Sequence, residues 1–268
     1  MMARMKGGAV VVAGVAFAAL AAGAMPCRAE TLRLATGELP PYATEGRSDQ
    51  GMALRIVREA FRSQGHEVMY TFLPWGRALE ETRAGKWDGT AYWGHKPEHE
   101  QSFLLSDNVL TEQWVVLHRA ALAVDWKQPE DLAAYTFGAV RTYTYTPEFH
   151  ALFASGRLQV DWTPDDIALL QKLAAGRVDV VLLDRNVACT LIDQHLTGAQ
   201  ARTIRAHPRL ITENFTTHLM LPKALPQSAA RLEAMNKGLA QLRASGEYRR
   251  LLEPPECKAG LAVPNLKG

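Results

Sequence analysis

Strand and helix patterns alternate along this chain, and the alternation constrains the fold more than any other feature. Residues 31–36 alternate apolar and polar side chains, which predicts a strand, and residues 52–64 carry apolar residues at helical spacing before Gly65. Further strands are expected at 68–73, 87–93 and 112–117, and a further helix at 75–83. Alternating elements of this kind predict an α/β fold with mixed, mainly parallel sheets.

The pattern restarts in the second half of the chain. Residues 163–166, Thr-Pro-Asp-Asp, predict a helix start with the threonine as N-cap, in a helix that ends before Gly176. An apolar strand buried on both faces is expected at 178–183. The other elements expected here are a short helix at 129–132, a strand at 136–140, a helix at 186–195, a strand at 215–221 and a helix at 228–244. The restart predicts two lobes, joined by extended segments near residues 111–121 and 211–219.

Residues 1–29 have the layout of a cleaved secretory signal. Arg4 and Lys6 precede an uncharged run at 7–25 that is rich in alanine, valine and glycine. Pro26 breaks this run, and small residues stand at the two positions that a signal peptidase reads before the expected cleavage. The sequence therefore predicts a periplasmic protein. The alternative is an N-terminal membrane anchor, for which the run is long enough.

Charge argues against a nucleic-acid partner. The first 29 residues hold three basic residues and no acidic one, so cleavage reduces the 30 basic and 28 acidic residues of the chain to 27 and 28. The resulting net charge is −1, whereas nucleic-acid binding needs concentrated positive charge. Cleavage also leaves Cys189 and Cys257 as the two cysteines. An even pair in an oxidising compartment predicts a disulfide, and two separate buried thiols are the alternative.

Several short motifs follow one another through nearly the whole mature chain. They are Tyr42 after a Pro-Pro pair, a helical stretch at 51–60, a Pro-Trp to Asp stretch at 74–88, Pro-Glu-His-Glu at 97–100 with Leu-Ser-Asp at 105–107, Asp-Leu at 131–132 with Phe-Gly-Ala at 137–139, and residues 173–184. In order and spacing they resemble the periplasmic solute-binding proteins of family 3, the polar amino-acid type that feeds ABC importers.

The resemblance implies a two-lobed periplasmic-binding-protein fold of type II with two hinge strands. Lobe one is expected at 30–115 and again, with the C-terminal tail, at 217–268, and lobe two at 116–216. The implied partners are one small-molecule solute and a membrane ABC permease, with the protein itself a monomer. No cofactor and no metal are expected. His95 and His99 are four residues apart, but the intervening proline and the lack of a third ligand argue against a metal site.

The resemblance also assigns a ligand-binding site between the lobes. Asp184 occupies the position at which the family accepts an ammonium group, and its alternative role is to cap the helix that follows it. His99 occupies the position of the family's carboxylate-binding arginine. Imidazole cannot form the planar two-pronged pair of a guanidinium, and Lys96 supplies only a point charge. The anchor for a free α-carboxylate is therefore in doubt.

Aromatic and polar loop residues complete the expected site. Tyr42, Trp75 and Trp93 follow strands of lobe one, where open α/β sheets bind ligands, and can enclose an apolar or cationic part of a solute. Trp75 could equally be a packing residue. Glu38 ends the first strand and, together with the acid at 184, would favour a cationic ligand.

The loop after the strand at 136–140 is expected to contribute from lobe two. Its residues Arg141, Thr142 and Tyr143 match the loop that the family uses for the anionic end of its ligand, and Arg141 could replace part of the missing arginine. A plain polar surface loop is the alternative. The same fold also carries enzymes, periplasmic dehydratases of prephenate-like acids, and sensor or accessory binding proteins. No motif here selects catalysis, and transport is the expected function.

Overall fold

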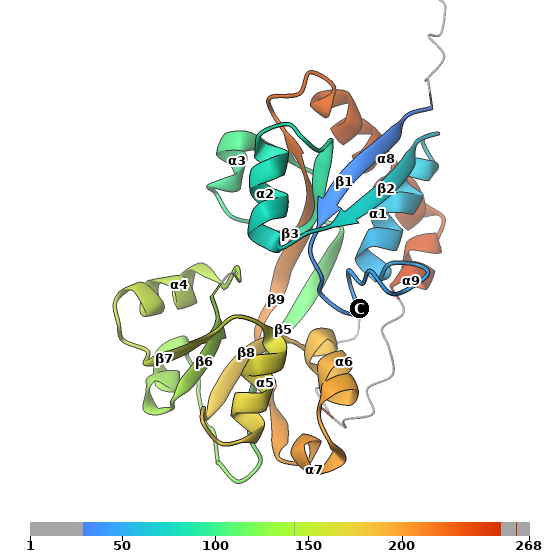
Figure 1. Cartoon of the computed structure of the whole chain (residues 1–268). Helices are drawn as coiled ribbons and strands as arrows, with labels where there is room; N and C mark the ends of the chain where they lie inside the picture. The colour runs from blue at the N-terminus through green and yellow to red at the C-terminus, as the bar shows by residue number, and fades with distance from the viewer. Residues whose placement is uncertain (1–28, 142, 253–260, 262–268) are drawn as a thin grey trace, which may run out of the picture.

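The structure is a computed structural model that describes residues 29–141, 143–252 and 261 (Figure 1). The expected signal segment, Thr142 and Cys257 lie outside these residues. No helix in the described part of the chain combines the length and the apolarity needed to span a bilayer.

One mixed sheet runs through the whole molecule. Its strands are β1 (Thr31–Thr36), β2 (Glu67–Phe72), β3 (Gly89–Gly94), β4 (Phe103–Leu105), β5 (Leu110–Arg119), β6 (Phe137–Val140), β7 (Val160–Thr163), β8 (Val180–Asp184) and β9 (Ile204–Pro222). Their order is β2-β1-β3-β9-β5-β8-β6-β7, and β4 also pairs with β9. Pairing is parallel at the two ends of the sheet and antiparallel around β5 and β9. The α/β class with a mixed sheet is confirmed.

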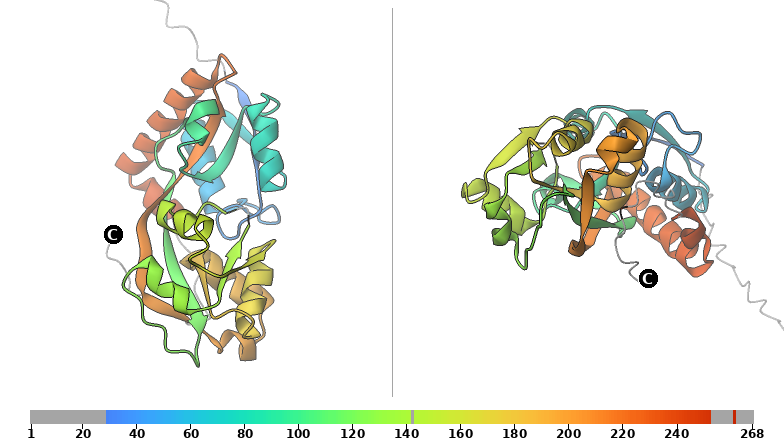
Figure 2. Two further views of the ribbon diagram at one scale, coloured as in Figure 1. Left: turned by 90° about the vertical axis from the view of Figure 1, so that its left-hand side faces the viewer. Right: turned by 90° about the horizontal axis from the view of Figure 1, so that it is seen from below.

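Helices cover the sheet in each half. They are α1 (Met52–Arg62), α2 (Trp75–Arg83), α3 (His99–Ser102), α4 (Pro147–Ala154), α5 (Asp166–Ala174), α6 (Arg185–His195), α7 (Gly198–Ala201), α8 (Ser228–Ala244) and α9 (Glu247–Leu251), with a 3₁₀ helix at Pro129–Ala134. In one half α1 packs against α8 beside β1, β2 and β3 (Figures 1 and 2). In the other half α5 and α6 pack beside β6 and β8.

The close approach of α1 and α8 depends on one glycine. A Cβ atom on Gly238 would overlap the backbone carbonyl of Ala60, so no larger residue fits here without moving a helix. Met235 and Leu239 flank this contact and are fully buried. Helices of ordinary spacing lie 8–10 Å apart, and glycine permits the closer contact.

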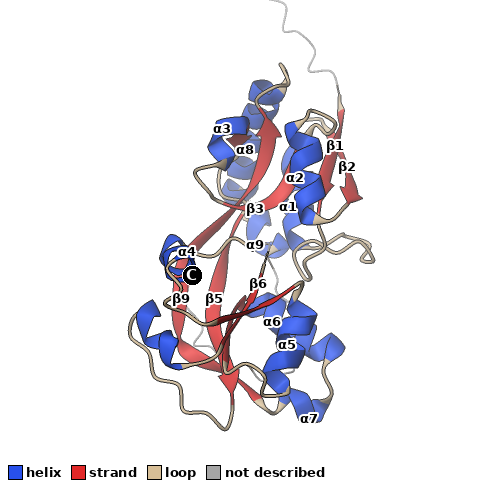
Figure 3. Ribbon diagram, turned by 60° about the vertical axis from the view of Figure 1, so that its left-hand side comes forward, coloured by secondary structure: helices blue, strands red, loops and turns tan. Residues whose placement is uncertain are grey.

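Strands β5 and β9 connect the two halves. They pair antiparallel from Leu110↔Thr217 to Arg119↔Ile204, and Figure 3 shows both passing from one half into the other. The register shifts between Glu112 and Leu117, which marks irregular pairing at the centre of this crossing. The lobe boundaries expected at 115/116 and 216/217 fall within these two strands, and they stay a prediction.

Most predicted elements have the expected type, but one helix start is wrong. The helix expected to be capped by Thr163 begins at Asp166, and Asp165 is its N-cap, accepting a hydrogen bond from the Ala168 amide. Thr163 instead ends β7, and its hydroxyl donates to the Ala139 carbonyl on β6. Both residues are good caps, and the strand pairing decided between them. The sequence analysis also missed α4, β7 and the short elements β4, α7 and α9. It missed the first half of β9 as well, which extends the strand expected at 215–221.

Candidate functional site

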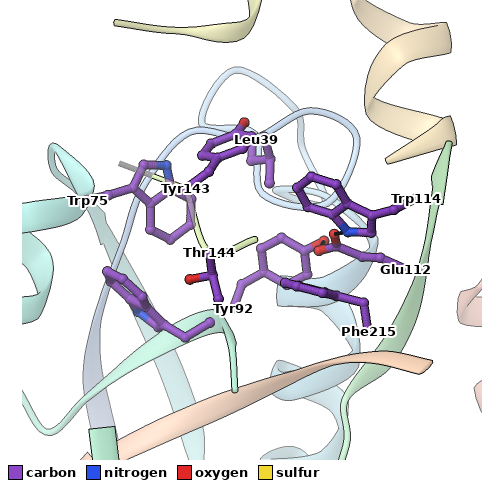
Figure 4. A pocket seen from close by; sticks show the side chains of 9 residues that line it. Leu39, Trp75, Tyr92, Glu112, Trp114, Tyr143, Thr144 and Phe215 are labelled. Atoms are coloured by element: carbon purple, nitrogen blue, oxygen red, sulfur yellow. Dashed lines mark hydrogen bonds between the residues drawn. The ribbon is translucent and has the colours of Figure 1, made fainter. Parts of the chain in front are cut away.

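A cavity opens where the two halves meet beside β5 and β9. It encloses about 480 Å³ of empty space, part of it open to solvent. The side chains that line it are mostly aromatic and come from both halves: Leu39, Trp75, Tyr92, Trp93, Glu112, Trp114, Tyr143, Thr144 and Phe215 (Figure 4). Small-molecule sites are mostly apolar with a few placed polar groups, and the lining of this cavity has that composition.

A local distortion of β3 brings two consecutive residues into the cavity. Successive side chains of a regular strand point to opposite faces. Tyr92 has a φ of 69°, and the register with β9 shifts between Thr90 and Trp93. A positive φ costs free energy for a tyrosine, and such strain concentrates at functional sites. The distortion allows both Tyr92 and Trp93 to line the cavity.

Two glycines give the aromatic side chains room to pack. The ring of Trp75 lies against Gly37, where any Cβ atom would overlap it, and its Nε1 donates to the Glu38 carbonyl at 3.3 Å. The ring of Phe215 lies against Gly94, where a Cβ atom would come within 2.6 Å of it. These contacts explain why the two rings stand on opposite sides of the cavity without steric conflict.

The rings contact one another around the cavity. Trp75 and Trp93 form an edge-to-face pair with centroids 5.3 Å apart. Trp114 lies 5.1 Å from Phe215 and 6.2 Å from Tyr143. Contacts at these distances hold each ring in place and leave other ring faces for a bound molecule.

Glu112 on β5 is the buried carboxyl group of the cavity. It is 4% exposed, and its two oxygens contact the Tyr92 hydroxyl and the Trp114 Nε1, the latter at 2.7 Å. Burial, and next the neighbouring charge of Asp184, raise the pKa of Glu112 to about 8. At neutral pH the group is therefore largely protonated in the empty cavity.

A second buried acid supports the wall formed by Tyr143. The Tyr143 hydroxyl donates to Asp166 at the start of α5. Burial raises the pKa of Asp166 to about 7, although the hydrogen bond from Tyr143 opposes the shift. The ring of Tyr143 lines the cavity while its hydroxyl is fixed from behind, so Asp166 positions this wall.

Asp184 ties three segments together at the crossing. Its Oδ1 accepts from the Asn186 and Val187 amides, at 2.8 and 3.0 Å, and caps α6. The same oxygen accepts from the Tyr42 hydroxyl at 2.8 Å, and Oδ2 accepts from the Gln113 amide at 3.0 Å. Tyr42 is likewise buried, and its ring is tilted against that of Tyr92 with the centroids 5.1 Å apart. Neither Asp184 nor Tyr42 is among the residues that line the cavity.

His99 lies behind the cavity wall. It is 6% exposed, its ring is edge-to-face with Trp93 at 5.8 Å, and its Nδ1 has no partner among the described residues. Burial, and next Lys96, lower the pKa of His99. The nearby His95 contacts Glu100, and no cluster of three or more metal-ligating side chains occurs within the described residues.

The structure brings three of the expected site residues into the cavity, and the other expected residues within its described part do not line it. Trp75, Trp93 and Tyr143 line it. Arg141 is exposed, with its guanidinium 5.8 Å from the Trp162 ring, and Glu38 is exposed and accepts from the Glu45 amide at 2.9 Å.

The sequence analysis missed six lining residues. They are Leu39, Tyr92, Glu112, Trp114, Thr144 and Phe215. One signal was available: Glu112 opens the predicted strand at 112–117 as a carboxylate directly before a mostly apolar run, with a tryptophan two residues later.

Comparisons with known proteins agree with this architecture. The sequence profile of the bacterial extracellular solute-binding proteins, family 3, matches residues 32–254. Among curated proteins, none matches the chain.

Solved structures share the fold at low sequence identity. One comes from a study of glutathione import in Gram-positive bacteria via GshT and the cystine ABC importer TcyBC of Streptococcus mutans. It matches with a TM-score of 0.69 and 18% identity, and the match covers 86% of this chain and 99% of the other. An ancestral arginine-binding protein bound to arginine has a TM-score of 0.68 and 19% identity, covering 82% and 96%. A histidine kinase sensor domain similar to periplasmic binding proteins has a TM-score of 0.68 and 16% identity, covering 84% and 94%. Identities this low support the two-lobed fold alone.

Proposed function

Because the chain belongs to the bacterial extracellular solute-binding proteins of family 3, we propose that it captures one small polar or amino-acid-like solute in the cavity between its lobes. It then presents the solute to a membrane ABC importer from the periplasm, after removal of residues 1–29. The observation that supports this proposal most directly is the origin of the cavity walls. Trp75 and Trp93 come from one lobe, Tyr143 comes from the other, and Glu112 and Phe215 come from the two connecting strands.

A solute in this cavity would couple binding to the relative position of the lobes. Contacts made to both lobes at once exist only while the lobes are closed, so the solute stabilises the closed arrangement by its differential affinity. A permease can then distinguish loaded from empty protein by shape. The binding proteins and the importer named among the similar structures fit this use of the fold.

Catalysis is the second candidate, and one observation favours it. A buried carboxyl whose pKa is near neutrality is what a general acid or base requires, and Glu112 has this property. We favour binding because the described cavity residues supply no cationic anchor of the kind that the dicarboxylate substrates of the related dehydratases would need. The experiment below therefore includes product analysis.

Tryptophan fluorescence tests the proposal, because three of the lining residues are tryptophans. Mature protein is screened against amino acids, polyamines and small organic acids by fluorescence and by thermal shift, followed by small-angle scattering with any solute that binds. A true ligand at a hundred times its Kd should stabilise the fold by about 2.7 kcal/mol and reduce the radius of gyration. Trp93→Leu should weaken binding at least tenfold, whereas Trp87→Leu, whose indole contacts Glu81 outside the cavity, should not.

Two results would contradict the proposal. One is that the Trp93 and Trp87 variants bind a validated solute equally well, since the cavity would then not be the site. The other is consumption of a solute in molar excess over the protein, with product appearing in the wild-type sample, which would support the catalytic candidate.

A further inference from the structure

We infer that the solute is a small organic cation without a neighbouring carboxylate, whose charged group lies against the aromatic rings with Glu112 as its counter-ion. This inference rests on the proposed function, because it names the ligand class of the same cavity. It is carried by the charge of the lining residues, the arrangement of the rings and the free hydrogen-bonding capacity of one buried carboxyl.

The charge of the cavity wall selects against an anionic end. Among the described lining residues, Glu112 is the one acidic group, and none is arginine or lysine. His99, at the position where the family resemblance places an arginine, lies behind Trp93 and does not line the cavity. A carboxylate entering here would meet aromatic faces and a like charge, with no guanidinium to pair with.

The arrangement of rings suits a cation. Five aromatic side chains line the cavity in addition to the tyrosine that contacts Glu112: Trp75, Trp93, Trp114, Tyr143 and Phe215 (Figure 4). The face of an aromatic ring carries partial negative charge and attracts a cation within about 6 Å of its centroid, tryptophan most strongly. Desolvated sites strengthen this attraction because little water screens it.

Glu112 retains capacity for a ligand. Each carboxylate oxygen can accept two hydrogen bonds, and the structure assigns one to each: Tyr92 contacts Oε1, and Trp114 donates to Oε2. The indole N–H can only donate, so the proton of the neutral acid belongs on Oε1, facing the tyrosine. A cation in the cavity would favour the ionised form, which accepts both bonds and keeps the other lone pairs for the ligand.

Binding should therefore release a proton. Buried acids and phenols surround Glu112 from each packed segment: Tyr92 on β3, Asp184 on β8, Asp166 on α5, Tyr42 in the β1–α1 loop and Tyr143 after β6. The two acids disfavour a further negative charge, and the hydrogen bond from Tyr92 offsets them in part. Neither lysine nor arginine is among the largest influences on the pKa of Glu112 within the described residues. An entering cation supplies the missing positive charge, so affinity for it should rise about tenfold per pH unit up to pH 8 and then level off.

Calorimetry with matched probes tests the inference. The cation choline and its neutral isostere 3,3-dimethyl-1-butanol are titrated into mature protein, with n-butylammonium as a primary amine and the zwitterions arginine and glutamine as comparison solutes. Repeating the titrations in buffers of different ionisation enthalpy counts released protons. We expect at least one of the two carboxylate-free cations to bind ten times or more tighter than the neutral isostere and the zwitterions, with close to one proton released at pH 7.

Glu112→Gln separates the counter-ion from the fold. Glutamine can accept from Trp114 and donate to Tyr92, as the neutral acid does, so the variant should fold. It should bind the cation at least tenfold more weakly, release no proton and keep its affinity for the neutral isostere. Glu100→Gln, an exposed acid outside the cavity, is the matched control and should behave as wild type.

The outcomes distinguish this inference from the proposed function. Tight binding of a zwitterion or an anion with no cation binding would overturn the inference and leave the proposed function intact. Equal binding of cation and isostere, or a Glu112→Gln variant that binds the cation as wild type does, would also overturn it. No stabilisation by any solute, including the wider screen above, would count against both.

Discussion

Replacing Glu112 with glutamine should change how the stability of the empty protein depends on pH. Burial holds the pKa of Glu112 at about 8 in the folded state, against 4.5 as the ordinary value. The folded state therefore binds more protons than the unfolded chain between these two values. The contribution of Glu112 to the free energy of unfolding is fully present below pH 4.5 and is lost as the pH rises towards 8. The cause is that ionising Glu112 in the folded protein places a charge in an apolar site.

The size of the effect follows from the shift. A difference of about 3.5 pKa units corresponds to roughly 5 kcal/mol over the full range, at about 1.4 kcal/mol per pH unit. Between pH 5.5 and 7.5 the wild-type protein should therefore lose about 3 kcal/mol that the glutamine variant keeps. Asp166 also has a raised pKa, but it is present in both proteins and its contribution largely cancels. Asp184 interacts with Glu112 directly, so the difference reports the titration of this pair.

Urea unfolding at several pH values measures this difference directly. The free energy of unfolding is determined for both proteins at pH 5.5, 6.5 and 7.5, and the wild-type value is subtracted from the variant value at each pH. The difference should grow by about 1.4 kcal/mol per unit of pH. If the free energies of unfolding of the two proteins change equally with pH, the argument is refuted. Such a result would show that Glu112 ionises in the folded protein at its ordinary pKa.

Three other changes test separate parts of the structure. Gly238→Ala should destabilise the protein by roughly 2 kcal/mol, the cost typical of overpacking, because its Cβ would overlap the Ala60 carbonyl. A chemical unfolding midpoint equal to that of the wild type would show that α1 and α8 can move apart at no cost. Cys189 and Cys257 should form a disulfide worth about 4 kcal/mol, seen by mass spectrometry of unreduced protein and as a loss of stability on reduction; two free thiols in protein from an oxidising compartment would contradict the pairing. His99→Arg should improve the affinity for plain α-amino acids if this position corresponds to the family's arginine, and unchanged affinity in calorimetry would count against that correspondence.

The fold could be predicted because its signals are local and repeated. The helix at 228–244 and the strand at 31–36 have the predicted bounds, because the local pattern of apolar residues and flanking glycines is enough to locate them. The capping error arose because Thr163 and Asp165 both carry an oxygen that can cap a helix. Thr163 is held in β7 by its pairing with β6, which leaves Asp165 as the N-cap. That choice depends on a partner strand more than twenty residues away, which local pattern cannot supply.

The site was harder to predict because its residues are assembled by the crossing strands. Trp75 and Trp93 were found from their position after strands of one lobe. Phe215 was missed because it lies inside a strand, where an aromatic residue ordinarily indicates core packing. Tyr92 was missed because a regular strand would turn it away from its neighbour, and the positive φ that reverses it has no signature in the sequence.

The position of Asp184 indicates which contacts stay fixed when the lobes move. Its carboxylate joins the Tyr42 hydroxyl, the Gln113 amide of β5 and the start of α6, so it lies at the crossing itself. Groups close to a rotation axis move least, and a buried carboxyl separated from its donors would lose several hydrogen bonds without compensation. Trp75 lies across the cavity from Glu112 (Figure 4), so its distance to the crossing residues changes more as the lobes open. We therefore expect Asp184 to act as a structural anchor where the lobes meet, while the proposed solute would be recognised by the rings and the carboxyl that face one another across the cavity.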